Sequence, residues 1–475
     1  MVTFFVCLVV LILGYLIYGT FVEKVFKPDD RKTPCVAHPD GVDFVPLKPW
    51  RAFLIQLLNI AGLGPIFGAL SGAIWGPSVL LWIVFGTIFA GAVHDFLSGM
   101  LSVRNDGASI SEIVGIYLGP KMKTVMRIFS VVLLVMVGVV FMVGPAGLLA
   151  LLTPDTLDVA FWTIVILIYY FLATLLPIDK VIGKIYPVFG ICLIIMAVGI
   201  GGATIINADT RPMMEMTLQN LHPDQKPIWP LMFITVACGA ISGFHATQSP
   251  MMARCMTSEK QGRRIFYGAM VAEGIIALIW ASAGIAFYYT TDGGLIKLLE
   301  AGGGNSSVVY EMSMSLLGPV GGVLAMVGVI ACPITSGDTA FRSARLTISD
   351  WFNIDQKDMK KRIALSIPLL LIGYIISKFD YQIIWRYFSW SNQTLAMIAL
   401  WAGAVYLGTS VSKKASLIAA IPATFMSAVS MTYILMADEG FKLSTSIAYP
   451  VGIIFAILLA GLFTYKIVIK AKKVS

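Results

Sequence analysis

Long runs of apolar residues, separated by short polar stretches, dominate the pattern along this chain. Residues 52–93 alone contain no charged side chain. A helix needs about 20 apolar residues to cross the hydrocarbon core of a bilayer, and continuous rather than alternating runs disfavour a β-barrel. The pattern predicts an all-α polytopic membrane protein. The thirteen predicted spans cover residues 2–22, 53–74, 78–102, 128–152, 159–177, 185–207, 228–250, 265–290, 314–340, 363–379, 384–408, 415–436 and 444–465.

Basic residues fall unevenly on the two sides that these spans define. One side holds six of the 34 lysines and arginines, and the other side holds the rest. Because positively charged loops stay in the cytoplasm, we expect the N-terminus outside the cell and the C-terminus inside. The first span lacks a basic leader and a small-residue cleavage site, so we expect a retained helix. The six outer residues are Arg211, Lys226, Lys297, Lys378, Arg386 and Lys442.

Composition supports the membrane class. The chain has 475 residues, of which 58% are hydrophobic and 13% charged, and its mean hydropathy is +0.85; soluble domains carry about 25% charged residues. The net charge of +8 would suit a nucleic-acid binder, but the basic residues lie in short loops on one side. We therefore expect the lipid bilayer as a partner and no nucleic acid.

Motifs of bond-breaking chemistry are missing from the sequence. It contains neither the G-x-x-x-x-G-K-[ST] nucleotide loop nor the H-E-x-x-H zinc pair. The six cysteines show no C-x-x-C spacing, so neither a disulfide framework nor a zinc site is expected. We expect no enzyme activity and no cofactor. Any transport would then be driven by an ion gradient or by simple diffusion.

Two predicted spans carry helix-breaking residues near their midpoints. In the second span, NIAGLGPIFGALSG contains Gly62, Gly64 and Pro65; in the seventh, ACGAISGFHATQSP contains Gly239 and Gly243. The two spans are five apart and run in opposite directions. Matched interruptions of this kind are typical of an inverted-topology repeat of five helices plus five.

The repeat divides the chain into four parts. Residues 53–207 form the first repeat, with spans 2–6, and residues 208–408 form the second, with spans 7–11. Residues 1–52 supply an N-terminal helix and a cytoplasmic loop. Residues 409–475 supply two accessory helices.

Interrupted helices at membrane depth predict a binding site. Non-helical backbone is tolerated there only where it lines a cavity or is buried in protein. Freed carbonyls can then bind a cation, and the N–H groups of a half-helix can bind an anion. The alternative is a packing kink between small residues, and neutral amides at this depth can simply join helices. The candidate substrate-binding residues are Gly62, Gly64, Pro65, Ser242, Gly243, Phe244, His245, Gln248, Asn392 and Gln393.

Three titratable residues are candidates for proton coupling or for a gate. Intramembrane carboxylates are costly and commonly functional, which applies to Asp338, although Arg342 lies one turn on and an ordinary ion pair is the alternative. His245 follows the second break and can exchange a proton near neutral pH, or else only pack. Asp95 is expected to pair with Arg345 or Arg104, as a gate or, preferably, as a structural ion pair.

Several segments of the chain resemble the carbon starvation protein (CstA) family. The resemblance implies a transporter of the bacterial inner membrane with the five-plus-five inverted-repeat fold (LeuT/APC-like), used in nutrient uptake during carbon starvation. Members include pyruvate transporters and proteins described as peptide transporters. The segments are HPDGVDFVPLKPW (38–50), IAGLGPIFGAL (60–70), FAGAVHDF (89–96), RNDGASISEIVG (104–115), ITVACGAISGFHA (234–246), TSGDTAFRSARL (335–346) and SNQTLAMIAL (391–400).

A looser resemblance links NIAGLG in the second span to the unwound first core helix of sodium symporters. It implies a sodium site between that helix and the eighth core helix, which is the ninth span here. Five oxygens suit a hard cation. The implied ligands are the carbonyls of Leu58, Ala61 and Cys332 and the hydroxyls of Thr335 and Ser336.

The function that follows is secondary active import of a small organic carboxylate, pyruvate first, coupled to H⁺ or Na⁺. A peptide transporter of the same fold is the nearest alternative. A channel, or a membrane sensor that signals through the polar stretch 341–362, comes from a different class. The sequence sets neither the coupling ion nor the oligomeric state.

Overall fold

The computed structural model of this chain is a bundle of helices. It describes all residues except 42–43, 176–177, 237, 289–294, 296–303, 355, 357 and 470–475, and its described part contains no strand. Ala237 in the second break and the tip of one quoted segment (Val42 and Asp43) therefore lie outside the described residues. The same holds for five of the basic residues counted above, namely Lys297, Lys357, Lys470, Lys472 and Lys473.

Nine helices of the described part are long and apolar enough to cross a membrane. Each coincides with a predicted span. They are α1–α2 (Val2–Phe26), α6–α7 (Ser78–Arg104), α9 (Pro120–Leu152), Pro187–Ile206 within α11 (Ile178–Ile206), α14 with the turns before it (Glu259–Tyr288), α16 (Gly304–Phe352), α18 with its extension (Tyr381–Val411), α19 (Leu417–Met436) and α20 with its extension (Thr445–Ile467).

The other four predicted spans are bent, broken or shorter helices. The second is a pair, α4 (Pro49–Ile60) followed by Gly64–Trp75, which contains α5 (Ala69–Gly72). The fifth is α10 (Val159–Leu175) and the tenth is α17 (Met359–Ile376). The seventh divides into α12 (Ile228–Thr235) and α13 (Gly243–Ala253). The predicted order of helices along the chain is therefore confirmed.

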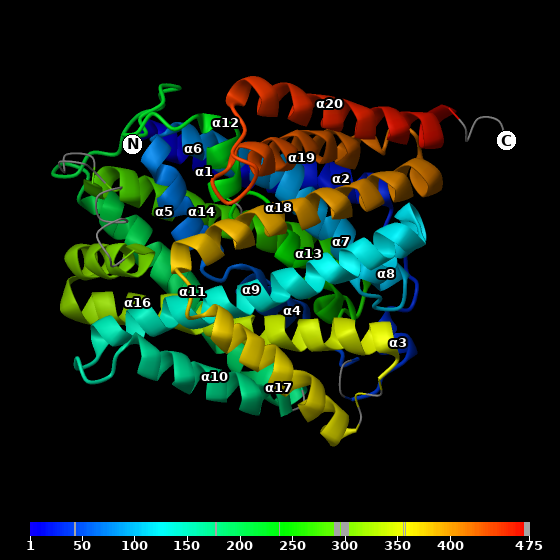
Figure 1. The fold of residues 1–475 in the computed structure, drawn as a ribbon, viewed down its shortest axis with the longest axis horizontal. Coiled ribbons are helices and arrows are strands. Elements are labelled where there is room, and N and C mark those ends of the chain that lie inside the picture. The colour runs from blue at the N-terminus through cyan, green and yellow to red at the C-terminus, as the bar shows by residue number, and fades with distance from the viewer. Residues whose placement is uncertain are drawn as a thin grey trace.

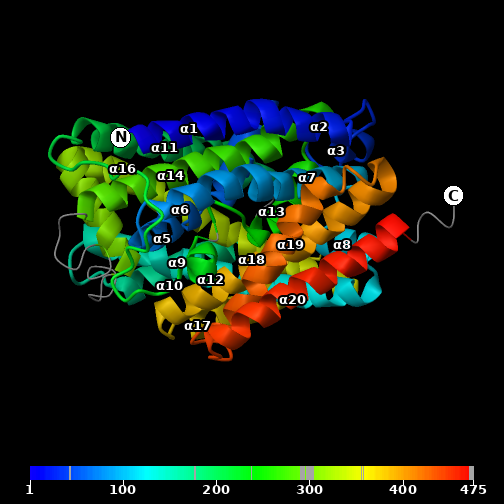
Figure 2. The same cartoon turned by 90° about the horizontal axis from the view of Figure 1, so that it is seen from above.

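The helices are arranged around two long neighbours, α9 and α16, which pack along each other. Figure 1 shows α9, α16 and α18 crossing the molecule, with α4, α7 and α13 between them and α20 at the outer edge. In Figure 2, α1 covers the opposite face. The N-terminus and the far end of α20 lie at opposite ends of the molecule in both views, as an odd number of crossings requires. The broken helices thus sit inside a scaffold of continuous ones.

One predicted boundary is wrong. Residues 341–362 read as a polar loop, but α16 continues to Phe352 and α17 begins at Met359. The helix can continue because its arginines find buried acceptors: Arg342 Nη2 donates to the carbonyl of Ala173 at 2.7 Å, and Arg345 Nη1 to that of Thr174 at 3.0 Å. Gly318, with φ of 68°, breaks the same element near its other end.

Candidate functional site

Both interrupted spans lose their helical course at membrane depth. The first bends by 54° between Ile60 and Gly64. The second stops at Thr235 and resumes at Gly243, and Gly239 between them has a φ of +94°, a conformation that glycine adopts without the penalty of a Cβ atom. The predicted breaks in both helices are confirmed.

The two breaks face each other in direct contact. A Cβ atom on Gly64 would lie 1.9 Å from Cys238 Cβ, and one on Gly239 would lie 3.5 Å from Pro65 Cα. Gly62 faces the ring of Phe141 on α9, 2.4 Å from where its Cβ would be. The small residues of the two interrupted motifs are therefore needed so that the two backbones can approach each other closely.

Asn392 of α18 holds the start of α13. Its Oδ1 atom accepts hydrogen bonds from the Phe244 amide at 2.7 Å and from Ser242 Oγ at 3.1 Å. A Cβ on Gly243 would lie 2.3 Å from the Asn392 carbonyl oxygen. The structure thus brings together four of the predicted substrate-binding residues. It also shows that an asparagine already occupies part of the anion-binding end of the half-helix in this state.

The other predicted amides are spread around the breaks. Gln393 points away from α13, since its Nε2 atom donates to the Phe233 carbonyl at 3.2 Å. Gln248 donates to Thr247 Oγ1 at 3.0 Å. Gln56 and Asn59 on α4 are fully buried, and their amide atoms find no hydrogen-bond partner within the described part of the chain. Buried amides of this kind need water or a ligand to satisfy them.

The residues of the implied sodium site also converge. Cys332 Sγ lies 2.9 Å from the Ala61 carbonyl oxygen, and Ser336 Oγ donates to the Leu58 carbonyl at 3.0 Å. The Thr335 and Ser336 hydroxyls both reach the Cys332 carbonyl, at 2.7 and 3.1 Å. The carbonyls of α4 are thus held against α16 by protein donors. A cation would replace these donors as the partner of the same oxygens.

Four titratable side chains form a buried cluster beside the second break. His94 and Asp95 come from α7 (Ala92–Arg104), His245 from α13, and Glu273 from α14 (Gly268–Tyr288). Each exposes 1% of its surface or less. His245 lies between two carboxylates: its Nδ1 is 2.9 Å from Asp95 Oδ2 and its Nε2 is 3.3 Å from Glu273 Oε2. We call these residues the acid–histidine cluster.

The pairing expected for Asp95 is wrong. Asp95 contacts His94 at 2.8 Å and His245 at 2.9 Å. Arg104 lies nine residues further, about 13 Å along the same helix, and pairs instead with Glu259 at 2.8 Å. The partner of Asp95 is therefore determined by the helix that packs against it and not by closeness in sequence. Asp338 lies outside this cluster, 3.9 Å from Arg342. This is the ion pair within one helix that the sequence offered as the alternative to a functional role.

Glu273 is the functional candidate that the sequence reading missed. It is the only charged residue between residues 265 and 290, and an isolated carboxylate in a membrane span indicates a functional site. That signal was present in the sequence. Its partner was not visible, because His245 is 28 residues away in another span.

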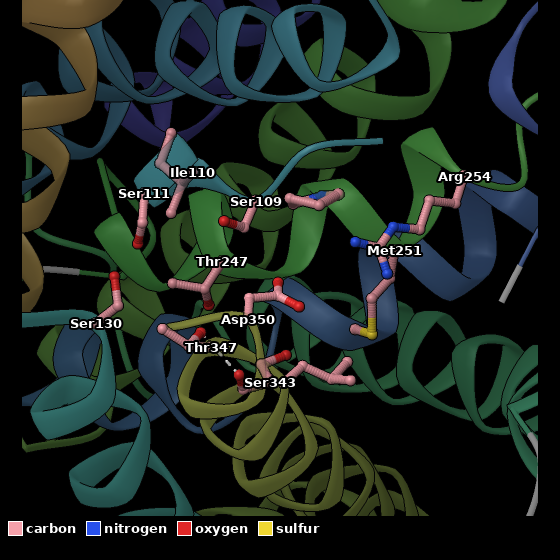
Figure 3. Close-up of a pocket in the computed structure, with 12 residues that line it drawn as sticks. Ser109, Ile110, Ser111, Ser130, Thr247, Met251, Arg254, Ser343, Thr347 and Asp350 are labelled. Atoms are coloured by element: carbon pink, nitrogen blue, oxygen red, sulfur yellow. Dashed lines mark hydrogen bonds between the residues drawn. The ribbon is translucent and has the colours of Figure 1, made fainter. Parts of the chain in front are cut away.

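A small cavity, with several polar side chains among its lining residues, opens on the other side of α13. It has a volume of about 40 Å³, enough for a few water molecules. Figure 3 shows hydroxyl groups from α8 (Ile110–Leu118) and its cap, α9, α13 and α16 around it. Thr247 lies two residues beyond His245 and so points to a different face of α13, and Arg254 places the cavity toward the end of the bundle that holds the basic loops. Its polar lining residues are Ser109, Ser111, Ser130, Thr247, Arg254, Ser343, Thr347 and Asp350.

A buried glutamate ties the segment that follows α2 (Thr20–Phe26) to that same end. Glu259, with no exposed surface, accepts from Arg104 Nε at 2.8 Å and from the Asp29 amide at 2.9 Å, and lies 3.4 Å from Arg31 Nε. Arg31 hydrogen-bonds Asp29 and holds the pKa of that carboxyl below its usual range. Cys35 also donates its thiol to the Met256 carbonyl. The segment therefore covers the end of the bundle.

We expect Glu259→Gln to loosen this cover. The substitution leaves Arg104, which is largely buried, without its charged partner, at a cost of about 1–3 kcal/mol. Thermal unfolding of the purified protein should occur at a lower temperature, and proteolysis should cut sooner between residues 27 and 48. Asp30→Asn is the matched control, because its ion pair with Lys260 is exposed on both sides. Equal behaviour of the two variants would contradict a structural role for Glu259.

Comparison with known proteins identifies the chain's relatives. The family model described as carbon starvation protein CstA matches residues 1–154, 149–291 and 293–433. An uncharacterized membrane protein of Haemophilus influenzae is 44% identical over 61% of this chain and 91% of its own. The peptide transporter CstA of Bacillus subtilis is 27% identical over 83% of both chains. The pyruvate/proton symporter BtsT of Escherichia coli is 26% identical over 68% of this chain and 56% of its own.

Solved structures agree on the fold. The transporter MhsT, determined with L-phenylalanine, superimposes with a TM-score of 0.56 at 14% identity, over 86% of this chain and 98% of its own. A manganese transporter from Eremococcus coleocola gives 0.55 at 11% identity, over 91% and 98%. Both are LeuT-fold transporters. The expected five-plus-five architecture is confirmed, and at these identities nothing about substrate follows.

Proposed function

Because this chain belongs to the carbon starvation protein CstA family, we propose that it is a secondary active transporter that imports a small organic carboxylate, pyruvate first, with a coupled cation. The observation that carries the proposal is the contact between two broken helices beside a buried ion cluster. Continuous helices would need no such break, and a structural core would not hold two fully buried carboxylates.

Several contacts favour a small anionic substrate. The start of α13 offers N–H groups and the positive end of a half-helix to an anion, and His245 lies in its first turn. The two breaks approach within van der Waals distance, so a modest separation of them would make room for a three-carbon acid. A relative that is named for pyruvate/proton symport supports the same substrate.

Two groups of residues compete for the coupling cation. The oxygens of Leu58, Ala61, Cys332, Thr335 and Ser336 supply the donor set of a sodium site, and their convergence between α4 and α16 favours it. The acid–histidine cluster favours a proton. The relative named as a proton symporter supports the second group.

We also propose an orientation of the chain in the membrane. With the basic loops in the cytoplasm, the small cavity beside Thr247 lies on the inner side of the breaks, which is the side where the substrate leaves. The surface with Glu215 and the N-terminus, which form an ion pair at 2.6 Å, then faces outward. The hydrogen bonds to that ammonium and to nearby amides lower the pKa of Glu215 to about 2.

Counterflow in proteoliposomes tests the function. Vesicles that contain the purified protein and unlabelled pyruvate should take up external labelled pyruvate, and an uncoupler should abolish accumulation but not this exchange. Sodium and pH are varied independently to identify the cation. Unchanged accumulation after both gradients are dissipated would contradict secondary active transport, and turnover at channel rates would indicate a pore.

Peptides are the second candidate, since relatives in Bacillus subtilis and Escherichia coli are named peptide transporters. Competition separates the two. Unlabelled lactate or another small monocarboxylate should inhibit labelled pyruvate uptake, and dipeptides should not. Strong inhibition by dipeptides with no inhibition by monocarboxylates would favour the peptide transporter.

A further inference from the structure

The acid–histidine cluster has the composition of a device that links a proton to an anion. We propose that Glu273 carries the coupled proton, and that His245 pairs with Glu273 in the empty protein and with the substrate carboxylate in the loaded one. The assignment rests on the proposed function and adds to it a residue and a stoichiometry.

The contacts show how the four side chains of the cluster are paired. Asp95 binds His94 through one oxygen and His245 through the other, at 2.8 and 2.9 Å. Glu273 takes the remaining nitrogen of His245 at 3.3 Å. Nδ1 of His245 shares a hydrogen bond with Asp95, whereas Nε2 faces Glu273 without hydrogen-bond geometry. Because a carboxylate faces each nitrogen, the protonated imidazole is the form of His245 that both carboxylates stabilise. His94 Nε2 has no hydrogen-bond partner in the described residues, so a neutral His94 avoids burying an unpaired charge.

Charge balance then couples the two solutes. One imidazolium faces two buried carboxylates, so the empty cluster carries one negative charge in excess, and burying an uncompensated charge is costly. A proton on Glu273 removes the excess and frees the second nitrogen of His245. A substrate carboxylate that takes that place returns the cluster to one excess negative charge while Glu273 stays protonated, but would bring the excess to two if Glu273 were ionised. The proton and the anion therefore bind favourably together, and each strengthens the binding of the other.

Of the two carboxylates, Glu273 has the weaker polar contacts. Its oxygens have no hydrogen bond of ordinary geometry in the described part of the chain, and the backbone of Gly239 in the second break is its other polar neighbour. Asp95 instead has two histidine partners. Protonation of Glu273 thus costs one long contact, whereas protonation of Asp95 would cost two short ones.

The position of the cluster lets it act on the broken helix. Asp95 and Glu273 lie on spans three and eight, which correspond in the two repeats, and His245 lies on the half-helix between them. Thr87 Oγ1, on the helix that leads into α7, also donates to the Gly239 carbonyl at 2.9 Å. Release of His245 by Glu273 therefore loosens α13 from α14 while Asp95 still holds it to α7.

Other titratable groups around the cluster are few. The residues that interact electrostatically with its members, within the described residues, are the members themselves and the thiols of Cys238 and Cys332. Thiols are ordinarily neutral at pH 7. Helix α18 contributes the neutral amide of Asn392, whose Nδ2 atom lies 3.4 Å from Cys238 Sγ. No lysine or arginine is among these partners, so the charge balance is set inside the cluster.

Glu273→Gln tests the assignment, because glutamine keeps the shape and neutrality of the protonated acid but cannot release a proton. The variant should still exchange labelled pyruvate by counterflow, because its permanently neutral side chain mimics the protonated, substrate-loaded state. Net accumulation under an inward pH gradient should be lost, whereas one pH unit supports about tenfold accumulation by the wild type, since each unit is a factor of ten per proton. A membrane potential alone should drive no accumulation by either protein.

Glu311→Gln is the matched control, a glutamate at the exposed surface of α16. Glu273→Asp, which keeps the exchangeable proton, should retain accumulation driven by the pH gradient. Size-exclusion profiles and unfolding temperatures confirm that each variant is folded. Accumulation by Glu273→Gln on a pH gradient would overturn the assignment, and so would loss of counterflow in the folded variant. Failure of the wild type to exchange pyruvate would instead overturn the proposed function, and the assignment with it.

Discussion

Replacing His245 with alanine is expected to abolish uptake and to lower the free energy of unfolding by about 3–5 kcal/mol, the usual cost of removing one partner from a buried ion pair. His245 is fully buried between Asp95 and Glu273. Its loss leaves two carboxylates inside the protein with no cation between them. Thermal unfolding of the purified variant and pyruvate counterflow measure the two effects.

A second substitution separates this electrostatic cost from simple loss of packing. Adding Glu273→Gln to His245→Ala removes one of the unpaired charges, so the double variant should be more stable than the single one. His38→Ala is the control, since His38 lies at the exposed surface directly after α3 (Pro34–Ala37). If the single and double variants unfold at the same temperature, the cluster is not held by charge.

The second large effect is expected from Gly64→Ala. The added methyl group would lie 1.9 Å from Cys238 Cβ, and overpacking of this kind costs about 1–3 kcal/mol. The clash also pushes apart the two breaks, which changes the site directly. We expect lower stability and severe loss of uptake, measured by thermal unfolding and by counterflow.

Rescue makes this test specific. Cys238→Gly removes the atom that the new methyl group meets, so the double variant should regain stability and part of the uptake. Gly202→Ala is the control, because nothing lies within 4 Å of its added Cβ. Wild-type behaviour of Gly64→Ala would show that the two breaks do not meet in the working protein.

The breaks themselves could be predicted because they are local features. Gly62, Gly64 and Pro65 cannot continue a helix without cost, and a second set of glycines recurs five spans later in the opposite direction. A periodic hydrophobic pattern and its interruption both depend only on residues that are neighbours in sequence. The contact of Gly64 with Cys238 then follows from the pseudo-symmetry of the repeat.

The charge pairs could not be predicted in the same way. Asp95 has basic residues nearby in sequence, yet its partner His245 is 150 residues away, on a half-helix whose rotation is set by packing against α7 and α18. Glu273 was visible as a lone carboxylate, but only the fold places it opposite the free nitrogen of His245. Pairing depends on the crossing of helices, which hydropathy does not encode.

The error in the predicted loop at 341–362 has a related cause. A run with Arg342 and Arg345 resembles an aqueous segment when read by charge alone. The structure buries both side chains against the carbonyls of Ala173 and Thr174, so helix α16 continues through it. Charged residues that find buried acceptors escape a rule based on average polarity.

The most direct test of the binding site is an experimental map of the purified protein with bound pyruvate. We expect density for the ligand between the two breaks, with its carboxylate at the first turn of α13 and within hydrogen-bonding distance of His245, and with Glu273 moved away. Ligand density elsewhere, with Gly64 still packed on Cys238 and His245 still paired with Glu273, would contradict it.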